Sequence, residues 1–301
     1  MTQKPAVSLV AVPGRRKATL ELAQEIERRG FAGIYCPSFG DGLGLCLALA
    51  FSTNEIRFGT SIANIYTRHA TDFAPTASWI HELSGGRFVF GVGVSHGPAH
   101  AQLGVQPGKP LADMRRFVEQ LRAAQGAGEQ PPVVLATLRR RMVRLADEIA
   151  DGIVWANGAR SHMESSLSNL PPEKRSSDGF FIGDMLPVCI SDDKAAAAAV
   201  MRRTLTGYVM LPNYQNYWIE AGYEEEITAI RQAAQAGDRE RIASLMSDRW
   251  LADVTLFGSA AEVREGVEAW YAAGVKTPIL VPSSTEGGQM RAFQELFAAF
   301  E

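Results

Sequence analysis

The chain has 301 residues, of which 46% are hydrophobic and 21% charged, so it can bury a large core and fits one large α/β barrel or two ordinary domains. A formal net charge of -3 and an isoelectric point near 6.0 exclude the basic surface that nucleic acid or an anionic membrane requires, which leaves a small molecule as the expected partner. Three scattered cysteines, Cys36, Cys46 and Cys189, exclude a disulfide framework and indicate a reducing compartment.

The beginning of the chain lacks the basic leader, apolar segment and small-residue cleavage site of an export signal. No apolar run approaches the length of a membrane span. These observations predict a cytoplasmic protein with no membrane partner.

The first third of the chain alternates short apolar runs with stretches of helical periodicity. This pattern predicts strands over residues 7–12, 32–36, 56–62 and 87–94, and helices over residues 17–29, 43–51 and 73–83. The helix over 43–51 is apolar on every side, so we expect it to be packed between layers. Residues 95–111 are rich in Gly, Pro and His and predict a long functional loop.

The rest of the chain continues the alternation until a long helical stretch interrupts it. Strands are predicted over residues 131–136, 152–156, 180–190 and 277–281, and helices over residues 113–124, 138–150, 259–274 and 289–300. Pro187 interrupts the strand over 180–190, which indicates an edge, a bulge or a bend. Residues 192–248 are purely helical in pattern, too long for one crossover, and so predict an insertion.

Eight predicted strands alternate with helices, and the first and last are both apolar runs that an open sheet would leave as edges. This favours a closed (β/α)8 TIM barrel over an open doubly wound sheet. We therefore expect one domain over residues 1–301, with a helical insertion at about 192–250 after strand seven.

Catalytic residues of such barrels lie at the carboxyl ends of the strands. No nucleophile and base pair, no Gly-x-Ser-x-Gly and no metal-binding spacing occurs there, so no metal is expected. The predicted strand ends instead carry glycines, hydroxyls and arginines, a set that suits the phosphate of a cofactor. These residues are Gly91, Gly93, Ser61, Ser95, Thr137, Arg139 and Arg140.

Three motifs resemble those of the bacterial luciferase-like flavin and deazaflavin oxidoreductases. They are Gly59-Thr-Ser-Ile62 followed by Arg68, then Leu83-Ser-Gly-Gly-Arg-Phe88, then Gly91-Val-Gly93. The resemblance implies that the cofactor phosphate is held by two groups of residues, Gly93, Val94 and Ser95 in one and Ala136, Thr137, Leu138 and Arg139 in the other. Many relatives have Gly-Pro where this chain has Leu138-Arg139. In relatives that use coenzyme F420, a cis peptide bond supports the ring, and by position it falls at Ser61–Ile62.

The resemblance implies an F420-dependent oxidoreductase that transfers a hydride between the deazaflavin and a small organic substrate. An FMN-dependent monooxygenase, using reduced flavin and O2 with a separate reductase as partner, is the first alternative. A cofactor-free, non-enzymatic barrel is the second. Relatives are often dimers, so the resemblance makes a homodimer possible, although no stretch of sequence identifies its interface.

Several of these residues also have a purely structural interpretation. His96 is the candidate for contact with cofactor or substrate, against a loop histidine that faces water. Gly91 and Gly93 either admit an anion or relieve crowding between strands. The aromatic residues Tyr214, Tyr217 and Trp218 of the insertion either line a substrate wall or pack in a core.

Overall fold

The structure is a computed structural model that describes residues 3–301. It contains two compact units. The first comprises the chain up to Trp155 together with Ser168–Gly183, and the second comprises Ala156–Leu167 together with Asp184–Glu301. Each unit has its own parallel strands and its own covering helices.

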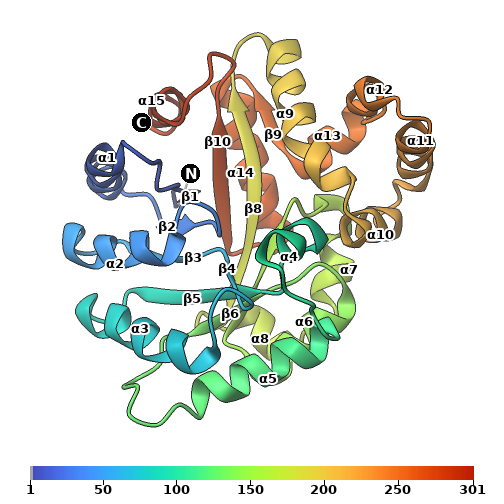
Figure 1. Ribbon diagram of the computed structural model, residues 1–301. Helices are drawn as coiled ribbons and strands as arrows, with labels where there is room; N and C mark the ends of the chain where they lie inside the picture. The colour runs from blue at the N-terminus through green and yellow to red at the C-terminus, as the bar shows by residue number, and fades with distance from the viewer. Residues whose placement is uncertain (1–2) are drawn as a thin grey trace. The chain divides into compact units, whose positions relative to one another are not determined.

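The strands of the first unit lie in the order β1, β2, β3, β5, β6 and β7, and each neighbouring pair is parallel (Figure 1). Their bounds are β1 (Ala6–Ser8), β2 (Gly33–Cys36), β3 (Arg57–Thr60), β5 (Phe88–Gly93), β6 (Val133–Ala136) and β7 (Gly152–Ala156). A short strand, β4 (Ala63–Asn64), pairs with the end of β5. Because the pairs are parallel, the carboxyl ends of these strands share one edge.

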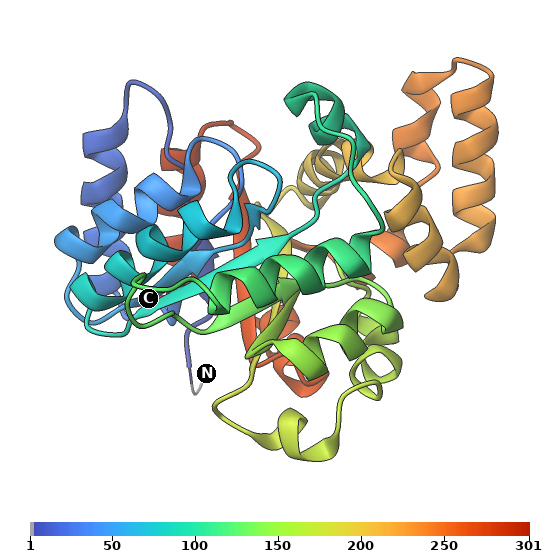
Figure 2. The ribbon, with the colours of Figure 1, turned by 60° about the horizontal axis from the view of Figure 1, so that its bottom comes forward.

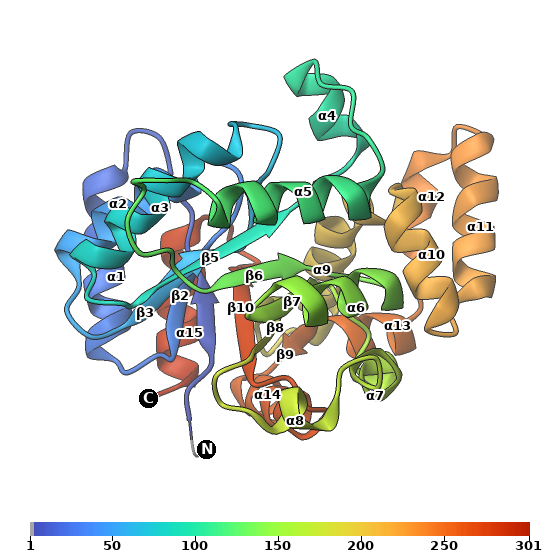
Figure 3. The same cartoon turned by 90° about the horizontal axis from the view of Figure 1, so that it is seen from below.

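The helices of the first unit are α1 (Arg16–Arg28), α2 (Gly42–Ser52), α3 (Ala70–Leu83), α4 (Gly97–Leu103), α5 (Pro110–Arg122), α6 (Arg140–Ile149) and α8 (Pro172–Ser176). Helix α1 buries a stripe that includes Leu22, Ala23 and Ile26. Helix α5 lies along β5 and β6 (Figure 3). Helix α4 buries no residue and stands away from the strands (Figure 2).

Aromatic side chains fill the core of the first unit. Phe58 and Phe88 are fully buried, with ring centroids 5.8 Å apart, and Phe90 lies 6.1 Å from Phe88. Burying each such ring stabilises the fold by about 1.5–3 kcal/mol relative to exposure. This core fixes β3 and β5 against each other, and so fixes the loops at their carboxyl ends.

The second unit is built on β8 (Phe181–Ile190), which pairs in parallel with β9 (Leu256–Gly258) and also pairs with β10 (Thr277–Ser283). The first residues of β8 belong to the first unit, and the last residue of β7, Ala156, belongs to the second. The helical segments of the second unit are η1 (Arg160–His162), α7 (Met163–Leu167), α9 (Lys194–Val209), α10 (Pro212–Glu220), α11 (Glu224–Gln235), α12 (Arg239–Ser244), α13 (Asp248–Val254), α14 (Ala260–Ala272) and α15 (Gln289–Ala299).

The aromatic residues of the helical insertion pack in a core of their own. Tyr217 and Trp218 are fully buried, and Trp218 meets Trp250 edge to face with ring centroids 5.0 Å apart. Tyr223 stacks on Trp250 at 5.5 Å. Of the two interpretations of these aromatic residues, core packing therefore holds for Tyr217 and Trp218.

All eight predicted strands are present, as β1, β2, β3, β5, β6, β7, β8 and β10, and the predicted fold class, a (β/α)8 TIM barrel, is confirmed. The predicted helical stretch after strand seven is present as α9 to α13. Strands β4 and β9 were not predicted, because two or three residues carry no periodicity.

Three local predictions were wrong or incomplete. Residues 95–111 are not one loop, because they contain α4 and the start of α5, each with a proline in its first turn. Helix α2 is not covered on all sides, since the Phe51 side chain is 71% exposed. Strand β8 continues through Pro187 without interruption, and its pairing with β9 starts at the next residue. Across residues 3–301, no helix combines the length and apolar character needed to cross a membrane.

Candidate functional site

Ser61 and Ile62 follow β3 at the carboxyl edge of the first unit. The Ser61 amide donates to the carbonyl of Cys36 at 2.7 Å, which ties the end of β3 to the end of β2. The Ser61–Ile62 peptide bond is cis, as predicted. The Ser61 side chain is buried, and within residues 3–301 its Oγ has no hydrogen-bond partner.

Gly93 ends β5 and is packed tightly between two of the other predicted cofactor residues. A Cβ added to Gly93 would lie 2.9 Å from the Cβ of Ala136 and 2.9 Å from Cδ1 of Ile62. A Cβ on Gly91 would lie 2.0 Å from the carbonyl oxygen of Thr60. Real Cβ atoms do not approach so closely, so strand packing requires both glycines. The same packing brings Ile62, Gly93 and Ala136 together.

Val94 and Ser95 form the turn that follows β5. Ser95 has a φ of 58°, a left-handed conformation that is uncommon for a residue with a side chain. The Val94 carbonyl lies 2.6 Å from His100 Nε2. The turn is thus held from α4, with the Ser95 side chain half-buried beside it.

Thr137 follows β6, and its amide donates to the carbonyl of Val154 at 2.8 Å. Its side chain is buried, and Oγ1 has no hydrogen-bond partner in the described part of the chain. The Leu138 carbonyl accepts from Trp155 Nε1 at 3.2 Å. Helix α6 begins directly after this residue, with Arg139 as its N-cap and Arg140 as its first residue.

Helix α6 starts with a concentration of positive charge. Arg139 is its N-cap and makes no capping hydrogen bond through its side chain, and Arg140 and Arg141 occupy the first turn, which contains no acidic residue. The dipole of a helix makes its N-terminus positive, so cations are unfavourable there unless an anion is bound. Arg139 and Arg140 are exposed. This end of α6 suits a phosphate.

His96 precedes α4 as its N-cap and is half-buried. Burial, and secondarily the nearby His100, lowers the pKa of His96 below its ordinary value. In the described residues its Nδ1 is buried and lacks a partner. The lowered pKa favours the neutral form of the His96 ring.

The sequence did not predict the contacts that anchor the α4 segment. The Tyr66 hydroxyl donates to Asp113 Oδ2 at 2.7 Å, and the Gly108 amide donates to the same oxygen at 2.7 Å. The His100 ring meets Tyr66 edge on, with centroids 5.1 Å apart. Asp113 is buried, so it ties the chain that follows α4 to Tyr66. The prolines in the first turns of α4 and α5 were the signal in the sequence that helices begin there.

The second unit contains a buried polar pair that was also missed. Asp184 is fully buried, and burial raises its pKa well above the usual range. Oδ1 accepts from the Gly158 amide at 3.4 Å, while Oδ2 has no partner among residues 3–301. Asn157 is 2% exposed with a φ of 57°, and its side chain lies beside the hydroxyls of Tyr208 and Tyr214. A single carboxylate within the apolar run of β8 was the signal for this pair.

Across residues 3–301, no cluster of His, Cys, Asp or Glu side chains has the arrangement of a metal site. The three cysteines are free and buried. The polar groups predicted at the carboxyl edge of the first unit are thus hydroxyls, backbone amides, arginines and a histidine, which are groups able to bind and orient a ligand.

The profile of the luciferase-like monooxygenase family matches residues 3–277. The chain belongs to that family. A protein of Mycobacterium tuberculosis, provisionally named a coenzyme F420-dependent oxidoreductase, is 27% identical over 286 residues, which cover 78% of this chain and 81% of that protein.

Two solved structures of this luciferase-like type show the same fold. The coenzyme F420-dependent tetrahydromethanopterin reductase of Methanopyrus kandleri superposes with a TM-score of 0.73 at 17% identity, covering 99% of this chain and 100% of that one. The oxygenating constituent of 3,6-diketocamphane monooxygenase of Pseudomonas putida, in complex with FMN, has a TM-score of 0.64 at 15% identity, with coverage of 99% and 95%. At these identities the likeness establishes the fold alone.

Proposed function

We propose that this luciferase-like protein is an F420-dependent oxidoreductase that transfers a hydride between the deazaflavin and a small organic substrate. The observation that carries the proposal is a pair of buried hydroxyls, Ser61 Oγ and Thr137 Oγ1, neither of which has a partner in residues 3–301. Buried polar groups are almost always hydrogen-bonded in a working protein, so these two hydroxyls indicate a polar ligand at the carboxyl ends of β3 and β6.

The start of α6 supports an anionic ligand beside Thr137. The helix has no side-chain cap, no acid in its first turn and arginines at positions 139, 140 and 141. Backbone amides and guanidinium groups at one helix end bind a phosphate by charge-assisted hydrogen bonds. Gly93, Val94 and Ser95 form the facing group, because Gly93 contacts Ala136, which directly precedes Thr137. These residues fit the phosphate of the cofactor.

A bound deazaflavin would supply the hydride chemistry itself, as such cofactors do. The protein's part is to hold the phosphate through Thr137 and α6, to place the ring near Ser61 and Ile62, and to exclude water. His96 is the candidate catalytic residue, since the free Nδ1 of its neutral ring can accept or return a substrate proton. The relatives from Mycobacterium tuberculosis and Methanopyrus kandleri support F420 as the cofactor.

An FMN-dependent monooxygenase is the second candidate. The FMN complex of the Pseudomonas putida relative has the same fold, and a phosphate-binding edge serves either cofactor. In that case a separate reductase would supply reduced flavin, and O2 would be a substrate. The cofactor-free barrel is the third candidate and rests on the replacement of Gly-Pro by Leu138-Arg139.

One set of titrations tests all three candidates. The purified protein is titrated with F420 and with FMN by fluorescence and calorimetry, and oxygen uptake is measured during turnover of the reduced complex. We expect F420 to bind at least about tenfold more tightly than FMN and no oxygen uptake. Tighter FMN binding with oxygen uptake would establish the monooxygenase, and a flat titration with both cofactors would establish the cofactor-free barrel.

A further inference from the structure

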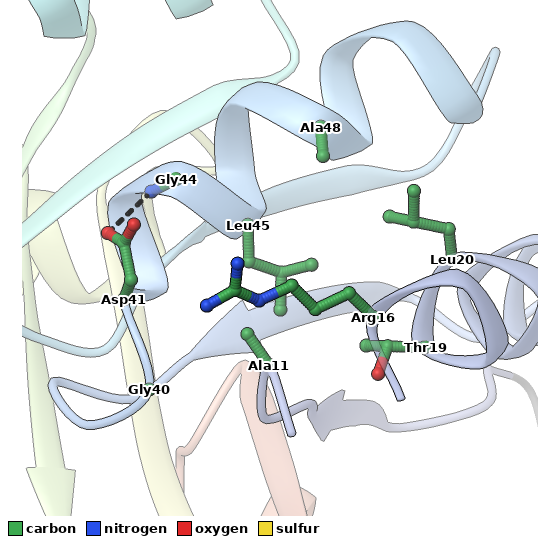
Figure 4. Close-up of a pocket in the computed structure, with 9 residues that line it drawn as sticks. All are labelled: Ala11, Arg16, Thr19, Leu20, Gly40, Asp41, Gly44, Leu45 and Ala48. Carbon is green, nitrogen blue, oxygen red and sulfur yellow. Dashed lines mark hydrogen bonds between the residues drawn. The ribbon is translucent and has the colours of Figure 1, made fainter. Parts of the chain in front are cut away.

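A cavity of 170 Å³ lies in the first unit between α1 and α2 (Figure 4). Its lining comes from α1, from α2 and from the segments that follow β1 and β2. None of the residues assigned above to the cofactor lines it. The chemistry of the cavity can therefore be considered separately from that of the proposed cofactor residues.

One wall of the cavity carries a positive charge with no internal partner. Figure 4 shows Arg16 extending from α1 across the cavity in the direction of Asp41 and the first turn of α2. No carboxylate within residues 3–301 forms an ion pair with Arg16. A guanidinium that projects over an apolar pocket without a counterion is a ready binding group for a carboxylate.

The start of α1 increases the positive potential at this wall. Arg15 is the N-cap without a capping side-chain bond, Arg16 and Lys17 form the start of the first turn, and that turn contains no acidic residue. The positive end of the helix dipole adds to these three cations. Such an arrangement is unfavourable alone and becomes favourable when an anion binds.

The remaining walls are apolar or already bonded. Leu20, Leu45 and Ala48 line the cavity with hydrocarbon, and the Thr19 hydroxyl donates to the Arg15 carbonyl at 3.1 Å. Asp41 lies on the opposite side, where its Oδ1 accepts from the Gly44 amide at 3.0 Å and caps α2. The negative charge of Asp41 disfavours a second anionic group on any occupant.

We propose that this cavity binds a short-chain organic monocarboxylate. The carboxylate pairs with Arg16, and the alkyl chain covers Leu20, Leu45 and Ala48. Its volume is below the roughly 300–1,000 Å³ of pockets for drug-sized ligands, so the occupant is small. Inorganic phosphate lacks the apolar part, an alcohol lacks the charge, and a dicarboxylate brings a second charge toward Asp41.

The proposal is tested by titrating the full-length protein with butyrate, 1-butanol, inorganic phosphate and succinate, with calorimetry and ligand-observed NMR as readouts. We expect saturable one-to-one binding of butyrate with a dissociation constant on the order of 1 mM. The other three compounds should bind at least about tenfold more weakly. No saturable binding of butyrate, or equal binding of phosphate, would overturn the proposal.

Two variants and a matched control locate the site. Arg16→Gln should weaken butyrate binding at least about tenfold, because it removes the charge-assisted hydrogen bonds. Ala48→Leu should abolish binding by filling the cavity. Lys17→Gln removes the same charge from the same helix end, but Lys17 does not line the cavity. The butyrate affinity of this variant should therefore stay within about twofold of the wild-type value. Equal losses in Arg16→Gln and Lys17→Gln would show a diffuse charge effect and overturn the site.

Discussion

Gly93 and Ala136 lie so close that a Cβ added to the glycine would be 2.9 Å from the Cβ of the alanine. The contact joins the end of β5 to the end of β6, where the two proposed phosphate-binding segments start. It leaves no room for a side chain at position 93. The spacing of the two segments depends on this contact.

Gly93→Ala is therefore expected to lower the free energy of unfolding by about 1–3 kcal/mol, because the Ala136 Cβ is fixed to a buried strand and cannot move aside. It should also weaken cofactor binding. Gly97→Ala is the matched control, since nothing lies within 4 Å of a Cβ at that position. Urea unfolding and cofactor titration check both variants. Equal stability of the two would contradict the packing described here.

Thr137→Val tests whether the buried hydroxyl serves a ligand. Oγ1 has no partner in residues 3–301, so its removal should leave the free energy of unfolding unchanged or slightly raised, while cofactor affinity should fall about tenfold. Thr255→Val is the control, because the Thr255 hydroxyl is buried and donates to the Leu251 carbonyl at 2.7 Å. That variant should lose about 1 kcal/mol of stability and keep its affinity. The reverse pattern would remove Thr137 from the site.

Asp184→Asn tests the buried carboxyl. Burial raises the pKa of Asp184 above its value in the unfolded chain, so between those two pKa values the folded protein holds a proton that the unfolded chain has lost. The contribution of Asp184 to the free energy of unfolding is fully present below the pKa of the unfolded chain. It falls as the pH rises toward the pKa of the folded protein, by at most about 1.4 kcal/mol per pH unit.

The Asp184→Asn variant should lack this pH dependence, so its free energy of unfolding should rise relative to that of the wild type as the pH rises. Urea unfolding at a series of pH values from acid to neutral measures the difference. Asp178→Asn, at an exposed position, should follow the wild-type profile. Parallel profiles for wild type and Asp184→Asn would show that Asp184 is ionised in the folded protein.

His96→Gln tests the candidate catalytic group. The variant should bind cofactor normally and turn over substrate at least about a hundredfold more slowly, since a positioned acid or base contributes about 10²–10⁴-fold. His69→Gln is a suitable control, because His69 is exposed and caps α3. Steady-state kcat and KM give the comparison. An unchanged kcat in His96→Gln would show that His96 is not the catalytic acid or base.

Phe51→Glu tests the expected homodimer. Helix α2 is strongly apolar and packs beside α3; Phe51 of α2 is 71% exposed and Trp79 of α3 is 58% exposed. Helices that are apolar on every side are normally covered, which favours a second copy at this face. Sedimentation should show a dimer for wild type and for the control Leu103→Glu, and a monomer for Phe51→Glu. A dimer in all three would place the interface elsewhere.

The parts of the fold that sequence could predict are those with a long apolar signal. The strands over 131–136 and 152–156 were found because each is a buried run bounded by polar residues. The cis bond at Ser61–Ile62 was predicted through the family resemblance and not from the residues alone. Helix α4 was missed because it buries nothing and so has no periodicity.

The site was predicted only in part, for reasons of packing. That Gly93 meets Ala136, and that Asp184 lies against Gly158, depends on contacts between residues far apart in the chain. Pattern along one strand cannot show such contacts. The cavity at Arg16 likewise exists only because α1 packs beside α2.

The anchoring of α4 has a consequence for how relatives of this protein diverge. Tyr66, Gly108 and Asp113 anchor the chain that follows the helix, while the helix itself buries no residue. Its solvent-facing positions can therefore accumulate mutations at little thermodynamic risk. Relatives could therefore acquire a different specificity through substitutions at these exposed positions of α4, while the rest of the fold stays unchanged.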